Sequence, residues 1–394
     1  MSLMHRLQMA LLATLLCAFS GQSVAKLRTS PPAEPLLLKA LQLQQAGDAR
    51  TARQQLQVLL RHHPNFRLAR WLHDELPDID CQNIADIADA DEKSWAEEAC
   101  LRLAAHAAKP QQGWLPDALI QLTSHSPQVI VVDLSLARLY LFRARKGRFS
   151  LVREHYAAMG REGYGKQDEG DLRTPLGVYR ITKWLDGRHL PELYGAGALT
   201  LDYPNSWDDL HQREGDGIWL HGVPSDTYVR APHSSEGCIT MANDDLLALR
   251  KEVRYGETPV IISDRLNWLS PDDFAASRRA FVSRIEDWGI QRTATDFSAY
   301  RVYYSAGFKS DGRDIYSFML HKQGLERDMA PVRQRLSELE LLRYPDNGDD
   351  ILVRARFNVR AQGRGHNAIT LQMQQYWRQE GDDWKIVREE IGRQ

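Results

Sequence analysis

The chain has 394 residues, of which 43% are hydrophobic and 26% are charged, the composition of an ordinary soluble globular protein with two or three domains. The formal net charge is −2, so bulk charge does not favour an anionic membrane or nucleic acid as a partner. No nucleic-acid partner is therefore predicted.

The first 25 residues are predicted to be a secretory signal peptide. Residues 5–6 give a basic start, residues 11–19 are apolar but too few to span a bilayer comfortably, and small residues precede position 26. We expect cleavage after Ala25; a retained N-terminal anchor is the alternative. No later run reaches the roughly 20 apolar residues of a membrane span. The sequence therefore predicts a periplasmic protein with no membrane span after signal removal.

Helical periodicity follows the signal peptide. Apolar residues recur at three- and four-residue spacing within residues 36–76, with breaks at residues 46–48 and at Pro64. The pattern resembles one tetratricopeptide unit, which cannot bury its own apolar face and must pack on something. The predicted partners are helices at residues 95–107 and 116–124, or a second subunit in a homodimer. A plain helical cap is the alternative to a peptide-binding repeat.

Three cysteines remain after the signal peptide, which contains Cys17, is removed. Exported proteins reach an oxidising compartment, where disulfides persist. Cys81 and Cys100 are close in sequence and are expected to pair, which would contribute about 3 kcal/mol in the chain-entropy model. Cys238 is left as an unpaired thiol, and its surroundings favour a reactive group over a buried structural cysteine.

A mostly-β domain is predicted from residue 128 onward. Runs of β-branched and aromatic residues bounded by turn residues are typical of strands, and helical periodicity is confined to residues 244–253. The predicted strands are residues 129–132, 139–142, 152–157, 177–181, 217–220 and 259–262.

The last part of the chain is predicted to be an α+β cone, with helices first and a curved antiparallel sheet after them. The helix at residues 273–288 has one apolar face, a shorter amphipathic piece covers residues 300–308, and strands are expected at 351–359, 369–378 and 384–389. The apolar face consists of Phe274, Phe281, Ile285 and Trp288.

Cys238 and His221 are the candidate catalytic pair. Cys238 follows a glycine and precedes a short helix, whose dipole is expected to lower the thiol pKa. His221 ends an apolar strand and is the predicted base; a cysteine and a histidine in contact suffice for acyl transfer. The backbone N–H groups of Gly237 and Cys238 are predicted to hold the oxyanion.

Two motifs resemble the YkuD-type L,D-transpeptidases. The first contains His221-Gly222 and, a short loop later, Ser235-Glu236-Gly237-Cys238-Ile239; the second, at residues 166–179, contains Gly-Asp-Leu-Arg-Thr-Pro-Leu-Gly. A weaker third match is Tyr203-Pro204-Asn205. The resemblance covers residues 127 to about 265.

The resemblance implies attack by Cys238 on the L,D amide of tetrapeptide stems in peptidoglycan. A thioester would form, D-alanine would leave, and an amine (transpeptidase) or water (carboxypeptidase) would resolve the thioester. By motif position, Cys238 is the nucleophile and His221 is the base. The remaining roles are the Gly222 carbonyl orienting His221, an oxyanion pocket shaped by Ser235, Glu236 and Gly237, and substrate binding by Arg173, Arg230 and Tyr203, with no cofactor and no metal.

The sequence departs from the resembled pattern at two positions. Glu236 stands where the family often has histidine, and Thr240 stands where it often has arginine. Thr240 removes a candidate clamp for a substrate carboxylate, which Arg230 or Arg173 would then supply, because a guanidinium pairs well with a carboxylate. These departures affect the identity of the acyl acceptor more than that of the nucleophile.

The domain layout resembles a second group, the cell-shape-determining L,D-carboxypeptidases with a C-terminal nuclear-transport-factor-two-like domain. Alternate residues on the predicted strands of the cone would face a pocket or be solvated. These residues are Arg354, Arg356, Arg360, Gln372 and Gln374.

The predicted fold is multidomain α+β. Two alternatives to a cysteine enzyme are a zinc site at His211, His221, His233 and Cys238, whose spacings match no common zinc pattern, and a non-catalytic cell-wall-binding scaffold. The predicted domains are the signal peptide (1–25), a helical tetratricopeptide-like region (26–126), a mostly-β YkuD-type catalytic domain (127–265) and a nuclear-transport-factor-two-like cone (266–394).

Overall fold

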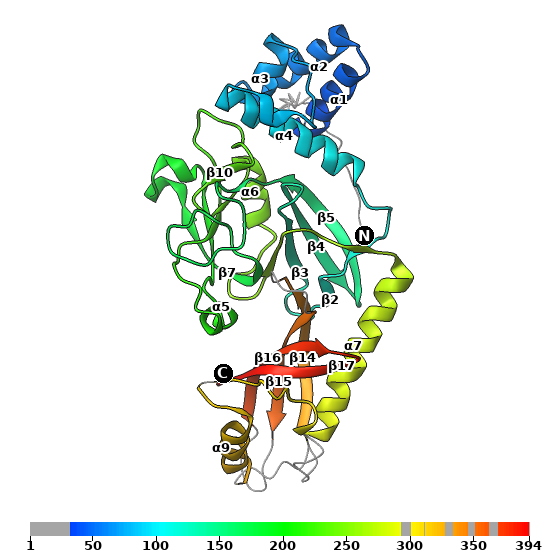
Figure 1. Cartoon of the computed structure of the whole chain (residues 1–394), viewed down its shortest axis with the longest axis vertical. Helices are drawn as coiled ribbons and strands as arrows, with labels where there is room; N and C mark the ends of the chain where they lie inside the picture. Colours follow the sequence, from blue (N-terminus) through cyan, green and yellow to red (C-terminus); the bar gives the residue numbers. More distant parts are fainter. Residues whose placement is uncertain are drawn as a thin grey trace, which may run out of the picture.

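The computed structural model describes residues 32–292, 301–310, 312–327, 334–345, 351–361 and 369–393. The predicted signal peptide lies outside these residues. Three bodies follow one another along the long axis: a helical region, a β-rich middle domain and a C-terminal domain of helices on a sheet (Figure 1). This arrangement confirms the predicted multidomain α+β fold. No helix within the described ranges is long and apolar enough to cross a membrane.

The helical region breaks where the sequence predicts. Gly47 adopts a positive φ of 79° between the first two helices, and the Asp48 side chain accepts a hydrogen bond from the Thr51 N–H at the start of the second. The Cys81–Cys100 disulfide ties the fourth helix to the segment before it, as predicted. The elements are α1 (Ala33–Gln45), α2 (Ala49–His62), α3 (Arg67–Asp74), η1 (Ile84–Asp86) and α4 (Ala90–Ala107).

The helix predicted at residues 116–124 is wrong. This segment forms two short strands, β1 (Leu115–Pro116) and β2 (Leu119–Gln121), and β2 pairs with the C-terminal sheet. The pairing partner lies more than 200 residues further along the chain, and such distant pairing overrides local periodicity. The segment between the helical region and the middle domain is therefore built into the C-terminal domain.

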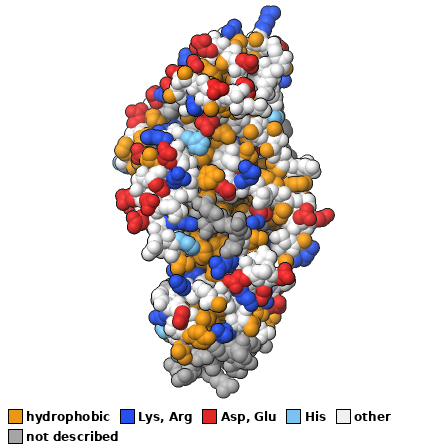
Figure 2. All heavy atoms as spheres, in the orientation of Figure 1, with side chains coloured by type: hydrophobic (Ala, Val, Ile, Leu, Met, Phe, Trp, Pro, Cys, Tyr) orange, Lys and Arg blue, Asp and Glu red, His pale blue; other side chains and the backbone are white. Residues whose placement is uncertain are grey.

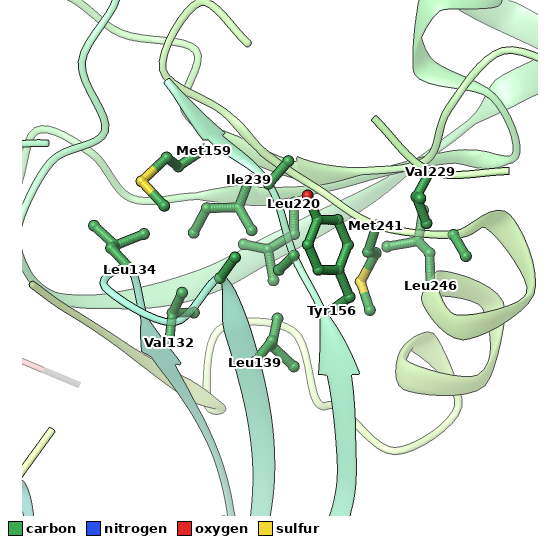
Figure 3. Packing of buried hydrophobic residues seen from close by; sticks show 14 of the residues in the cluster. Val132, Leu134, Leu139, Tyr156, Met159, Leu220, Val229, Ile239, Met241 and Leu246 are labelled. Carbon is green, nitrogen blue, oxygen red and sulfur yellow. The ribbon is translucent and has the colours of Figure 1, made fainter. Parts of the chain in front are cut away.

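An eight-stranded sheet with the order β11-β9-β8-β7-β12-β3-β4-β5 dominates the middle domain. Buried hydrophobic side chains, Leu220 and Ile239 among them, pack together in its core (Figure 3). The six predicted strands are confirmed. The elements are β3 (Gln128–Asp133), β4 (Arg138–Arg145), β5 (Arg148–Tyr156), β6 (Met159–Gly160), β7 (Gly177–Asp186), η2 (Gly187–His189), η3 (Glu192–Tyr194), β8 (Gly197–Leu201), α5 (Ser206–Leu210), β9 (Trp219–His221), β10 (His233–Ser235), β11 (Ile239–Thr240), α6 (Asn243–Arg250) and β12 (Pro259–Ser263).

The C-terminal domain packs helices on one face of a five-stranded sheet with the order β17-β16-β15-β14-β2. A long helix, α7, runs beside the middle domain to this sheet (Figure 1), and the four residues of its predicted apolar face are the ones it buries. The short piece predicted at 300–308 lies partly outside the described residues. The elements are β13 (Trp268–Leu269), α7 (Pro271–Gln291), α9 (Ile315–Arg327), β14 (Gln334–Tyr344), β15 (Leu352–Ala361), β16 (Ile369–Glu380) and β17 (Asp383–Arg393).

Buried charges join the C-terminal sheet to the middle domain. Glu340 accepts from both Arg180 of β7 and Arg354 of β15, and Arg354 also donates to the Val178 carbonyl at 2.8 Å. All three charged side chains are buried. Trp207 of α5 stacks on Tyr376 of β16, with ring centroids 4.8 Å apart. This contact fixes the C-terminal sheet against the middle domain.

The residues predicted to face a cone pocket have different environments. Arg356 and Gln372 line a cavity of about 300 Å³ between the two domains, so a pocket within the cone itself stays a prediction. Arg354 is buried in the ion pair with Glu340, and Gln374 donates to Ser206 of α5 at 3.3 Å. Arg360 is exposed.

Over the face shown in Figure 2, acidic and basic side chains are interspersed.

Candidate active site

Two neighbouring parallel strands bring the predicted catalytic residues to one place. β9 ends at His221, and β11 begins immediately after Cys238. The strands pair in parallel with Ile239 opposite Leu220 and Thr240 opposite His221. Leu220 and Ile239 are fully buried in the core of the middle domain, which fixes both strands (Figure 3). The two motifs therefore meet at one end of the sheet.

His221 has the orientation and the protonation state of a general base. Its Nδ1 lies 2.7 Å from the Gly222 carbonyl oxygen, as predicted from the resemblance. Because a carbonyl can only accept, Nδ1 carries the proton and Nε2 keeps its lone pair. Burial lowers the pKa of His221 to about 4, and the nearby Arg230 charge acts in the same direction. His221 is therefore neutral at pH 7.

The Cys238 thiol is also neutral at pH 7, contrary to the expected helix-dipole effect. The thiol donates to the Gly217 carbonyl, 3.4 Å away, and burial raises its pKa to about 11. A backbone hydrogen bond from Trp219 opposes this rise. The predicted lowering is wrong because β11 follows Cys238 directly, and α6 begins only at Asn243. A neutral thiol beside a neutral imidazole requires the base to take the proton during attack.

The Ser235 side chain holds the turn that presents Cys238. Its Oγ donates to the Cys238 carbonyl at 2.5 Å and accepts from the Gly237 N–H at 3.1 Å. The Gly237 N–H is therefore engaged within the turn, and the roles of the Gly237 and Cys238 N–H groups in holding an oxyanion stay predictions.

Thr174 connects the upstream motif to the same turn. Its Oγ1 donates to the Gly237 carbonyl at 3.0 Å and accepts from the Gly160 N–H at 2.9 Å. Gly237 has a φ of 122°, and a Cβ there would lie 2.8 Å from the Arg173 carbonyl oxygen. The spacing of the two motifs thus reflects a direct contact between them, in which only glycine fits.

The predicted substrate-binding residues differ in their access to Cys238. Arg230 is half-buried, and its charge interacts with those of Cys238 and Glu236, while Glu236 is exposed. Arg173 is exposed and donates to the Tyr164 carbonyl at 3.2 Å. Tyr203 is buried and its hydroxyl donates to the Glu214 carbonyl, and its contact with substrate stays a prediction. The Arg230 guanidinium donates to the Ser234 carbonyl at 2.7 Å, and its role as a carboxylate clamp also stays a prediction.

Three residues near the pair escaped prediction from the sequence. The Tyr194 ring packs edge-on against the His221 ring, with centroids 4.9 Å apart; burial raises the pKa of Tyr194, and the charges of Cys238 and Glu236 add to the rise. Lys166 is buried near Cys238, and its charge favours the thiolate. The third residue is Asn243.

Asn243 fastens the chain just beyond the base. Its side-chain amide donates to the Val223 carbonyl at 2.8 Å, and its carbonyl oxygen accepts from the N–H groups of Ala196 and Val223. A Cβ on Gly222 would lie 2.0 Å from this oxygen. The glycine after His221 was the available signal, because it indicates a close approach by another group.

The histidines of the zinc alternative have other partners. His211 Nδ1 contacts the Trp207 carbonyl at 2.8 Å in α5, and His233 Nε2 lies 3.3 Å from Glu97 of α4. Among the described residues, no group of three or more histidine, cysteine, aspartate or glutamate side chains is placed to hold a metal ion.

Comparison with known protein families identifies two domains in the chain. Residues 127–262 match the L,D-transpeptidase catalytic domain family, YkuD, and residues 280–390 match the Cds6 C-terminal NTF2-like domain family. Both resemblances inferred from the sequence are confirmed at the level of these domains. Among curated proteins, none matches the chain by sequence.

Solved structures with a similar fold cover most of the chain. Bd1075 of Bdellovibrio bacteriovorus is 29% identical with a TM-score of 0.62, over 71% of this chain and 99% of that chain. The helical cell shape determining protein Pgp2 of Campylobacter jejuni is 22% identical with a TM-score of 0.57, over 70% of this chain and 96% of that chain. At the lower identity, the likeness concerns the fold alone.

Proposed function

We propose that this L,D-transpeptidase catalytic domain modifies peptidoglycan by forming a thioester between Cys238 and a tetrapeptide stem. The observation that carries the proposal is the His221 hydrogen bond to the Gly222 carbonyl, because it leaves Nε2 as an acceptor on the strand beside Cys238. The disulfide suits an oxidising compartment, and peptidoglycan lies outside the cytoplasmic membrane, so the proposed location is the periplasm.

The proposed reaction begins with attack by the Cys238 sulfur on the amide carbonyl between diaminopimelate and D-alanine. His221 Nε2 takes the thiol proton as the C–S bond forms, and the Cys238 N–H donates to the oxyanion. The C–N bond then breaks, and His221 returns its proton to the leaving D-alanine amine. In the second half, an acceptor loses a proton to His221 as its lone pair attacks the thioester carbonyl; the C–S bond then breaks, and His221 returns the proton to the Cys238 sulfur.

An amine acceptor makes the enzyme an L,D-transpeptidase, and water makes it an L,D-carboxypeptidase that trims tetrapeptide to tripeptide stems. Carboxypeptidase activity is the second candidate, because an exposed Glu236 stands next to the thiol-bearing turn and Thr240 is buried, so neither supplies a cationic clamp for a second stem. The similarity in fold to a cell-shape-determining protein supports this candidate. The competing class is a wall-binding scaffold.

Incubation with purified peptidoglycan, followed by separation of muropeptides by mass, tests the function. Loss of tetrapeptide with gain of tripeptide indicates a carboxypeptidase, and new stem-to-stem links indicate a transpeptidase. Unchanged muropeptides with protein pelleting on the wall would support the scaffold. Cys238→Ala should abolish the thioester seen by intact mass while leaving the fold intact, and an active Cys238→Ala variant would refute the mechanism.

A matched pair of histidine variants isolates the base. His221→Gln should slow acylation by about 10²-fold or more, the usual contribution of a general base. His211→Gln is the control, because His211 makes the same kind of Nδ1 contact to a backbone carbonyl, at a different place in the middle domain. Equal losses in both variants would contradict the assignment of His221.

A further inference from the structure

The loop between His221 and Cys238 is held by the helical region. This His–Cys loop (residues 222–237) contains Arg230, the arginine whose charge reaches Cys238. The Tyr228 N–H donates to the Asn65 carbonyl at 3.1 Å, and the Asn65 side chain donates to the Ser225 carbonyl at 3.1 Å. The turn between α2 and α3 therefore binds the loop through its backbone.

Side chains strengthen this contact on both sides of the turn. The Tyr228 ring lies between His63 and Phe66, with centroids 4.6 and 4.7 Å away. Phe66 is almost completely buried, so this part of the contact excludes water. Arg67 pairs with Asp226 at 3.0 Å, but both side chains are mostly exposed, and such pairs contribute little. Tyr228 is therefore the main anchor.

The fourth helix supports the same loop from a second direction. Glu97 of α4 contacts His233, which begins β10 near the end of the loop. Arg102 of α4 lies over the Tyr156 ring, 4.0 Å from its centroid, and the Tyr156 hydroxyl donates to the Arg230 carbonyl at 3.1 Å. Contacts from the helical region thus reach positions on both sides of Arg230.

Residues 222–232 contain no helix or strand. Their conformation therefore depends on loop hydrogen bonds and tertiary contacts. The Arg230 guanidinium donates to the Ser234 carbonyl at 2.7 Å, just before the Ser235 turn that presents Cys238, so its position follows that of the loop. The Cys238 thiol responds to several charges: Arg230 and Lys166 favour the thiolate, and Glu236 disfavours it. A change in the loop alters one of these charges while leaving the nucleophile and the base in their strands.

We propose that the helical region is a positioning element of the active site: by gripping Tyr228, it holds Arg230 toward Cys238. The proposal rests on the proposed function for the roles of Cys238 and Arg230. It gives the tetratricopeptide-like unit a role within this chain, because the turn between α2 and α3 binds the His–Cys loop. Tyr228 is then a positioning residue, acting through Arg230.

Alkylation of Cys238 in the intact, non-reduced protein tests the proposal without any cell-wall substrate. Tyr228→Ala should slow alkylation by about fivefold across pH 8–10, because the thiolate loses part of its stabilising charge. Tyr228→Phe keeps the ring and should restore the rate to within about twofold of the unmodified chain. The control Tyr255→Ala removes an exposed tyrosine from the middle domain and should also stay within about twofold.

An unchanged alkylation profile in a folded Tyr228→Ala variant would overturn the proposal. If that variant does not fold, Tyr228→Leu replaces it, because leucine keeps an apolar side chain while removing the ring contacts with His63 and Phe66; the expected direction and the overturning result are the same. Arg230→Met should give the same slowing, and adding Tyr228→Ala to it should slow the reaction no further. A muropeptide assay that shows no reaction, with these alkylation differences intact, would refute the proposed function and leave the positioning proposal standing.

Discussion

The middle domain is held on two sides by buried charges, but only one side also contacts the loop between the catalytic residues. Toward the C-terminal domain, Glu340 is buried between Arg180 and Arg354, and aromatic rings stack beside them. Toward the helical region, Glu34 of α1 accepts from the buried Arg138 of β4 at 2.6 Å. Separate from that ion pair, the His–Cys loop is bound to the helical region by backbone hydrogen bonds, the Tyr228 ring and the exposed pair Arg67–Asp226.

This difference separates stability from chemistry. Breaking a buried ion pair by removing one partner leaves uncompensated charge and is strongly destabilising. Loosening a half-exposed loop contact costs less, but it moves groups near the thiol. We therefore expect variants at the C-terminal contact to lower stability without changing Cys238 reactivity, and variants at the contact on the His–Cys loop to change Cys238 reactivity with a smaller loss of stability.

The largest expected effect is on stability at Glu340. Glu340→Gln leaves Arg180 and Arg354 buried without their carboxylate and should cost about 3–5 kcal/mol in urea unfolding. The matched control on the other contact is Asp226→Asn, whose exposed pair should contribute less than about 1 kcal/mol. Both variants are also alkylated at Cys238 below their unfolding transitions. A slower alkylation in Glu340→Gln would contradict the separation of the two contacts.

Acid titration distinguishes the active site, through His221, from the C-terminal contact, through Glu340. The pKa of His221 is about 4 in the folded chain and about 6.5 in the unfolded chain. As the pH falls, the imidazole of the unfolded chain therefore binds a proton before that of the folded chain does. Stability should therefore fall between pH 6.5 and 4, by up to about 3 kcal/mol at pH 4. Glu340, whose pKa is lowered by its arginines, loses its contribution only as the pH falls further, through its folded pKa.

His221→Gln should flatten this loss between pH 6.5 and 4 while leaving the loss at lower pH in place. Thermal unfolding followed in steps across the range measures both parts. If the stability profile of His221→Gln matches that of the unmodified chain, the His221 imidazole is not the group that binds the extra proton in the unfolded state.

The disulfide should connect stability with chemistry on the helical side. Replacing both Cys81 and Cys100 by serine should destabilise the helical region by about 3 kcal/mol in the chain-entropy model. Because α4 also presents Glu97 and Arg102 to the loop and to Tyr156, alkylation of Cys238 should slow as well. The measurement pairs helical unfolding by circular dichroism with the alkylation rate. Lower stability with an unchanged rate would limit the role of α4 to folding.

Local periodicity predicted the elements whose partners are close in sequence or whose pattern is regular. The apolar face of α7 and the breaks around α2 follow from spacing alone. β14 was not predicted, because a bulge at Ser337–Glu340 interrupts its alternation and the adjacent Leu341 and Leu342 are both fully buried, in clusters on opposite faces. The prediction of a helix at β2 was wrong because β2 is a strand only through its pairing with β14, which the sequence pattern did not show.

Prediction of the site residues was limited in the same way, to residues within contiguous motifs. Cys238, His221 and the Gly222 carbonyl were predictable because the motifs that hold them are contiguous. Tyr194, which packs on His221, and Tyr228, which anchors the His–Cys loop to the helical region, were not, because neither belongs to a motif. The lowered thiol pKa was wrongly predicted because the distance to the next helix is set by β11, which the sequence pattern did not show.

The smallest expected effects have opposite signs, and they test the charge balance around Cys238 directly. Arg230 favours the thiolate, so Arg230→Met should raise the pKa of Cys238 and slow its alkylation by about fivefold at pH 9. Glu236 disfavours the thiolate, so Glu236→Gln should lower the pKa and speed alkylation by about threefold. Both substitutions remove one charge, so a shared structural disturbance would move both rates in one direction. If the two rates change in the same sense, charge is not what these residues contribute, and the grip of the helical region on the loop would lose its link to the thiol.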